Sequence, residues 1–146
     1  MVPKLTVDAS AYIALSCYLL LMPMGWVSGV LLAMAVHEFG HCAAIWALGG
    51  SVYRIHLSAF GAKIETQPMD HRQTLLCALA GPAAGLLLCL FFRWIPMVSI
   101  CALAQTVFNL IPIGPFDGGR AVKAFVGLRK DKAVAKSADS VYNNSN

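Results

Sequence analysis

The chain has 146 residues, enough for one domain, and only 12% of them are charged, against about 25% in soluble proteins. Together with a hydrophobic share of 58%, this shortage of charge excludes a disordered protein and a nucleic-acid-binding module. Three stretches of 20 or more residues lack Asp, Glu, Lys, Arg and His, at residues 9–36, 73–92 and 94–116. Because about 20 apolar residues carry a helix across a bilayer, the composition predicts a small all-α polytopic membrane protein.

Four apolar helices are predicted in chain order, at about residues 5–22, 25–48, 72–92 and 95–113. Pro23 and Gly25 separate the first two, because the uncharged run that contains them is too long for one straight crossing. The first helix spans the hydrocarbon only if Asp8 lies at the interface. The predicted core therefore has three or four transmembrane helices.

The hydrophobic period changes from helical to alternating between the second and third helices. Tyr53, Ile55 and Leu57 alternate with polar residues, which predicts a short, half-buried β-hairpin at about residues 52–66. After the fourth helix, the sequence favours a short interfacial helix over residues 118–128 and a polar, disordered tail over residues 129–146. Residues 1–128 then form the membrane-embedded core.

Basic residues are distributed unevenly over the predicted loops. With four crossings, ten of the eleven Lys and Arg residues fall on the side that holds the N-terminus, the hairpin and the C-terminal tail, and only Arg93 falls on the other. Cytoplasmic loops carry an excess of Lys and Arg. We therefore expect a multi-pass membrane protein whose hairpin and tail are cytoplasmic.

The second helix contains a short cluster of ionisable residues, His37-Glu38-Phe39-Gly40-His41. Residues four apart share a helix face, so His37 and His41 can bind one zinc ion while Glu38 lies near a metal-bound water. Alternatively, the two histidines form hydrogen bonds within the bundle and Glu38 is protonated. An ionisable residue inside a membrane helix costs about 2.5–3.5 kcal/mol, so three together favour the metal.

A hydrolytic zinc site usually has a third protein ligand, and Asp117 is the candidate. It follows a stretch broken by Pro112, Gly114 and Pro115, where irregular backbone can turn a carboxylate toward the second helix. Asp117 could instead cap a helix that begins at Gly118. Gln105 and Asn109 lie on one face of the fourth helix and indicate a polar interior there, which favours the ligand.

The cluster at His37–His41, followed by Asn109-x-x-Pro112 and Asp117-Gly118, resembles the paired signature of the site-2 protease family of intramembrane zinc metalloproteases. The resemblance extends over about residues 25–128. The segment at Phe60-Gly61, the Gly81-Pro82 helix and Asp117-Gly118-Gly119-Arg120 are most similar to the branch that contains stage IV sporulation protein FB.

The resemblance implies that His37, His41 and Asp117 hold one Zn²⁺ per chain, that Glu38 activates water, and that Asn109 orients the substrate or the oxyanion. It implies an endopeptidase of the bacterial cell membrane that cleaves a membrane-spanning or membrane-associated regulatory protein near the cytoplasmic side, as in sporulation. Many members of the family have a PDZ or CBS domain or further helices. Neither is recognised among these 146 residues, so we expect a minimal core, a truncated product, or a protein that needs a regulatory membrane partner.

Two other classes of protein are consistent with the same residues. A catalytically silent binding protein could retain the metal site and hold a membrane partner. An ion or proton relay could use His37, Glu38 and Asp117, because ionisable groups inside membranes also mark such paths.

Overall fold

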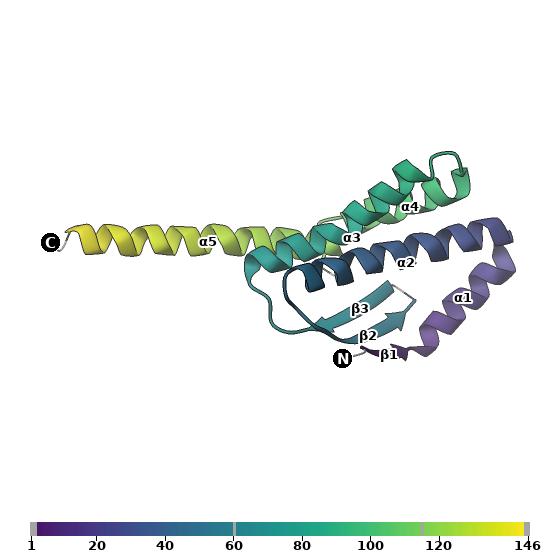
Figure 1. Cartoon of the computed structure of the whole chain (residues 1–146), viewed down its shortest axis with the longest axis horizontal. Coiled ribbons are helices and arrows are strands. Elements are labelled where there is room, and N and C mark those ends of the chain that lie inside the picture. Colours follow the sequence, from purple (N-terminus) through teal and green to yellow (C-terminus); the bar gives the residue numbers. More distant parts are fainter. Residues whose placement is uncertain (1–2, 60, 115, 145–146) are drawn as a thin grey trace.

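A computed structural model describes residues 3–59, 61–114 and 116–144, and for residues 137–144 it describes the backbone alone. The chain is mostly helical, with one small three-stranded sheet beside the helices (Figure 1). The sequence predicted helices and a hairpin, and the third strand is an addition to that prediction. Phe60 and Pro115, which belong to two of the predicted motifs, lie outside the described residues.

The sheet has the order β1-β2-β3, with β1 at Lys4–Val7, β2 at Val52–Ser58 and β3 at Gly61–Thr66. β2 and β3 form the predicted antiparallel hairpin, and β1 pairs with β2 in parallel. We predicted that residues 5–8 begin the first helix, and that prediction was wrong. Lys4–Val7 pair with β2 instead, and Leu5 and Val7 are exposed. Asp8 caps the helix that follows, and its carboxylate accepts a hydrogen bond of 2.9 Å from the backbone N–H of Ser10.

Four apolar helices follow the predicted order, but the first and last of them are shorter than predicted. They are α1 at Ala9–Leu21, α2 at Met24–Ala47, α3 at His71–Phe91 and α4 at Pro96–Asn109. Within the described residues, α2 and α3 are long and apolar enough to cross a membrane. At 1.5 Å per residue, α1 and α4 are roughly 20 Å long, less than the roughly 30 Å of a hydrocarbon core, so a core of three or four crossings stays a prediction.

The last helix, α5 at Asp117–Asn144, is much longer than the predicted short interfacial helix. Residues 129–144 continue it as helix, so the predicted disordered tail was wrong for that segment. No Gly or Pro interrupts this segment, and Arg, Lys and Ala are strong helix formers. Asp131 lies 3.9 Å from His71 and so joins this segment to α3, and within α5 the Arg129 guanidinium lies 4.8 Å from the centre of the Phe125 ring.

Small residues let the central helices approach closely. A Cβ atom on Gly40 of α2 would lie 2.6 Å from the carbonyl oxygen of Ala80 on α3, and one on Gly29 would lie 2.9 Å from the carbonyl oxygen of Met97 on α4. In the described parts of the chain, one cluster of buried residues packs between α2, α3 and α4, with Ala33, Leu88, Val98 and Ala102. A second packs between α2, α3 and β2, with Cys42, Ile45, Val52 and Cys77. This packing fixes α2 against α3, where the site described next lies.

Candidate metal centre

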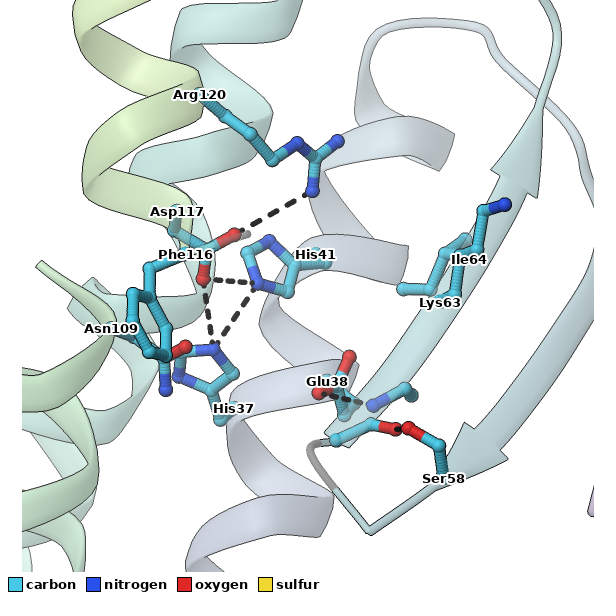
Figure 2. Close-up of a pocket in the computed structure, with 12 residues that line it drawn as sticks. His37, Glu38, His41, Ser58, Lys63, Ile64, Asn109, Phe116, Asp117 and Arg120 are labelled. Carbon is cyan, nitrogen blue, oxygen red and sulfur yellow. Dashed lines mark hydrogen bonds and ion pairs between the residues drawn. The ribbon is translucent and has the colours of Figure 1, made fainter. Parts of the chain in front are cut away.

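Three side chains that lie up to 80 positions apart in sequence converge on one point (Figure 2). The Nε2 atom of His37 and the Nε2 atom of His41 lie 3.1 and 3.0 Å from Oδ2 of Asp117, and 3.2 Å from each other. All three residues are buried. The structure thus brings the histidine pair of α2 together with the carboxylate at the start of α5, as the sequence predicted.

The segment between α4 and α5 turns Asp117 inward. α4 ends at Asn109, and short hydrogen-bonded turns follow, in which Ile113 donates to the carbonyl of Ile111 at 2.8 Å and Phe116 donates to that of Ile113 at 3.1 Å. Gly118 lies against the carbonyl of Leu110, so a Cβ atom there would collide with backbone. The compact turn requires a glycine directly after Asp117, which explains the Asp-Gly pair in the sequence.

The geometry of these three atoms fits a bound zinc ion. Nδ1 of His41 lies 2.8 Å from the carbonyl oxygen of Cys77, which only accepts, so Nδ1 carries the proton and the neutral ring has its lone pair at Nε2. That lone pair faces a carboxylate oxygen at 3.0 Å, an arrangement that requires a proton or a cation between them. Tetrahedral zinc, with ligands at about 2.0–2.1 Å, separates its ligand atoms by about 3.3 Å, close to the separations observed here.

Asp117 is held as a carboxylate rather than used as a helix cap. Burial acts to raise the pKa of Asp117, but its contacts with His37 and His41 outweigh burial and hold the pKa well below its usual range. The other oxygen, Oδ1, lies 3.5 Å from Arg120. Within the described part of the chain, this carboxylate accepts from no backbone N–H, and α5 begins at Asp117 itself, which argues against the capping alternative.

Glu38 lies next to this centre and under the hairpin. It is half-buried on α2, and its Oε1 accepts a hydrogen bond of 3.4 Å from the backbone N–H of Ala62 at the start of β3. Gly61 precedes this contact with a φ of 117°, which a residue with a side chain rarely adopts. The hairpin therefore approaches the carboxylate through its backbone.

A cavity of about 730 Å³ adjoins the three converging residues and Glu38. Asn109 lines it from the end of α4, and one N–H of its amide donates to the carbonyl of Gln105 at 3.0 Å, which leaves the second N–H and the oxygen for other partners. Phe116 lines it just before α5 and Arg120 lines it from α5. The hairpin contributes the remaining residues, namely Ser58, Gly61, Ala62, Lys63 and Ile64. All five residues singled out from the sequence, namely His37, Glu38, His41, Asn109 and Asp117, line this one cavity.

Two contributors to the site were not recognised in the sequence. Arg120 appeared in the motif that begins at Asp117 but was given no role in the site, although its spacing of three from Asp117 on a helix could have indicated the contact. Cys77 acts through its backbone carbonyl, which accepts from His41. No sequence pattern indicates that role, because it depends on how α3 packs against α2.

The sequence of the chain is similar to those of two curated proteins. No protein-family model matches the chain. Over 123 residues the chain is 32% identical to "Putative zinc metalloprotease sll0528" of Synechocystis sp., an alignment that covers 69% of this chain and 32% of that protein. It is 24% identical over 155 residues to "Putative zinc metalloprotease Rip2" of Mycolicibacterium smegmatis, covering 75% of this chain and 60% of that one.

Among solved structures, the chain matches the site-2 protease from Methanocaldococcus jannaschii with a TM-score of 0.72 and 20% identity. The match covers 84% of this chain and 66% of that one, and the chain spans 32% and 60% of the lengths of the two curated relatives. The chain has the fold of the M. jannaschii site-2 protease, and both curated relatives are named as putative zinc metalloproteases.

Proposed function

We propose that this chain is a zinc-dependent intramembrane endopeptidase. One observation carries the proposal: two imidazole nitrogens and a carboxylate oxygen lie within 3.2 Å of one another at a cavity that also contains Glu38. Three protein ligands with an open position are typical of hydrolytic zinc sites, whereas structural zinc sites have four. The two curated relatives named as zinc metalloproteases support the same chemistry.

His37, His41 and Asp117 would hold the zinc, through the atoms that face one another. When bound there, zinc supplies a Lewis acid that polarises the substrate carbonyl and lowers the pKa of water toward neutrality. The Cys77 carbonyl keeps the proton of His41 on Nδ1, so that Nε2 presents its lone pair to the metal. Arg120 holds the second oxygen of Asp117, which leaves Oδ2 directed at the two imidazoles.

Glu38 would act as the general base and then as the general acid. Its carboxylate lies in the cavity, one residue along α2 from His37, where it can take a proton from the attacking water and deliver it to the leaving amine. The amide of Asn109, with one N–H free of helix contacts, would orient the substrate carbonyl or its oxyanion. Each step thus has a residue of this chain within the same cavity.

The sheet would hold the substrate in an extended form. A membrane helix has its carbonyls hydrogen-bonded internally, so a substrate must unwind before it is cleaved. β3 is an outer strand of the sheet, and the N–H of Ala62 points from it to Glu38. An unwound segment that pairs with this edge would therefore lie beside the catalytic carboxylate, although a hairpin that only links α2 to α3 is the alternative.

The substrate we propose is a membrane-spanning or membrane-associated regulatory protein, cleaved near the cytoplasmic side. The excess of basic residues on the side of the hairpin and α5 supports that orientation. Similarity of the motifs to stage IV sporulation protein FB motivates a role in sporulation, and a regulatory membrane partner is part of the same proposal. Proteins that accumulate uncut in a strain lacking this chain would identify the substrate.

The test of the chemistry compares Glu38→Gln with Glu65→Gln, which makes the same change on the exposed side of β3. Both variants and the wild type are reconstituted in liposomes with a membrane substrate from the deletion strain, and zinc content and cleavage are measured. We expect Glu38→Gln to keep its zinc and to lose activity by about 10²–10⁴-fold, the usual contribution of a general base. Unchanged cleavage by Glu38→Gln would contradict the mechanism.

The same preparations distinguish the two other classes. A wild-type protein that binds chelator-sensitive zinc stoichiometrically but cleaves nothing would be a silent binding protein. Ion flux through the liposomes that disappears in Glu38→Gln and Asp117→Asn would indicate a relay instead.

A further inference from the structure

Gly81 of α3 lies directly against the imidazole of His41. A Cβ atom built on Gly81 would lie 2.5 Å from Cε1 and 2.9 Å from Cδ2 of that ring, and Nε2 would be its closest neighbour. Carbon atoms that are not bonded to each other are most favourably separated by about 3.5–4.0 Å. The space beside the metal-facing edge of His41 therefore exists only because residue 81 has no side chain.

The opposite edge of the same ring is also held by α3. Nδ1 of His41 lies 2.8 Å from the carbonyl oxygen of Cys77, four residues before Gly81 and on the same helix face. His41 is only 4% exposed, so its ring is enclosed except where it borders the cavity. A methyl group at position 81 would have to rotate the ring, which would break the bond to Cys77 or move Nε2 away from Asp117.

The glycines that simply allow close packing of helices have different neighbours. Gly40 faces the backbone of Ala80, and Gly85, one turn after Gly81 on α3, faces the hydroxyl of Thr106 on α4. Among the glycines of the described residues, Gly81 alone has one of the three converging metal-site side chains as its obstructing neighbour. Its position thus links helix packing to the geometry of the metal centre.

We propose that Gly81 is a positioning residue for the metal centre: the missing side chain at position 81 and the Cys77 carbonyl together fix the His41 imidazole, so that Nε2 faces His37 and Asp117. This inference rests on the proposed zinc site. Gly81 contacts no substrate and supplies no ligand. It acts only through the orientation of His41.

The first test titrates metal-free protein in detergent with Co²⁺, whose visible absorption reports the number and geometry of its ligands. We expect Gly81→Ala to weaken Co²⁺ and Zn²⁺ binding by about 10–100-fold, as is usual for residues that orient a ligand, and to change the Co²⁺ spectrum. Gly85→Ala is the matched control, because it adds the same methyl group to the same helix against Thr106. It should keep the wild-type spectrum and an affinity within threefold.

The second test needs no metal and covers the case in which Gly81→Ala does not fold alone. The thermal midpoint in chelator is compared for the wild type, Gly81→Ala, His41→Ala and the double variant. Removing the imidazole removes the obstruction, so Gly81→Ala should lower the midpoint in the wild type and should not lower it in His41→Ala, where the added methyl also favours the helix. The double variant should fold even if Gly81→Ala does not.

Each outcome decides between the two proposals. Wild-type affinity and spectrum in Gly81→Ala, or an equal loss of midpoint with and without His41, would overturn the positioning role and leave the zinc site intact. A wild type that binds neither metal would overturn the proposed function, and the inference that rests on it.

Discussion

The charge balance of three buried atoms is the feature from which the chemistry of this protein follows. Two imidazole nitrogens and a carboxylate oxygen lie 3.0–3.2 Å apart, and all three residues are buried. Lone pairs this close in a buried site repel one another unless a proton or a cation lies between them. A divalent cation is the group that satisfies three converging lone pairs.

Removing the carboxylate tests which role Asp117 has. Asp117→Ala should lose most of its zinc, because the two histidines alone make an incomplete site. Asp131→Ala makes the same change on the exposed part of α5 and should keep one zinc per chain. Metal content after dialysis is the measurement. Full zinc occupancy in Asp117→Ala, combined with a lower thermal midpoint, would restore the helix-cap interpretation.

Asn109 is expected to affect turnover and not metal binding. Its amide lines the cavity, and in the structure one of its N–H groups contacts only the carbonyl of Gln105. Asn109→Ala should therefore retain zinc and lower kcat by about 10²–10³-fold, as loss of an oxyanion donor does in other hydrolases. Gln105→Ala leaves the backbone carbonyl in place and should have little effect. Loss of zinc in Asn109→Ala would contradict the assignment.

Site residues were predictable from the sequence where a single helix sets their relative positions. The spacing of His37 and His41 places both on one face of α2, and a break after α4 indicated that Asp117 turns inward. The contacts of Cys77 and Gly81 were not predictable, because they arise where α3 packs against α2 and involve a carbonyl and a missing side chain. Local patterns identify possible ligands but not the groups that orient them.

Among the secondary-structure elements, the prediction failed at β1, where a strand-like alternation directly precedes a helical hydrophobic pattern. The alternation in β1 covers only Lys4–Val7 and directly precedes an apolar helix, so the longer helical pattern concealed it. Pairing with β2 is a contact over about 50 positions, which the sequence does not show locally. In contrast, the hairpin was predictable because its alternation is long enough to stand out on its own.

The start of α3 offers a test at this scale, since α3 carries both contacts to His41. The carboxylate of Asp70 accepts from the N–H of Gln73 at 2.7 Å, and the Gln73 side chain accepts from the N–H of Asp70 at 3.1 Å. Asp70→Ala should lower the free energy of unfolding by about 1 kcal/mol, whereas Asp70→Asn keeps the capping oxygen and should change it little. Thermal midpoints measure both. An equal loss in the two variants would show that charge, not capping, matters there.

The arrangement of the whole molecule constrains how it can sit in a membrane. Because β1 pairs with β2, the chain must leave the sheet along α1 and return to it along α2. Figure 1 shows the α1–α2 and α3–α4 connections at one end of the molecule, away from the sheet. The N-terminal strand, the hairpin and α5 should then share one side of the bilayer, even though α1 and α4 are short for full crossings.

Tags placed at three points test this topology. A tag before Lys4 and one after α5 should be accessible from the same side of sealed membranes, and a tag inserted at Arg93 should be accessible only from the other. In this topology, ten of the eleven basic residues are on the same side of the membrane as the first two tags, so that side should be cytoplasmic. Zinc and Glu38 would then be reached by water from the cytoplasm, because they lie toward the sheet end of α2. Terminal tags on opposite sides would contradict the β1–β2 pairing as well as the proposed side of cleavage.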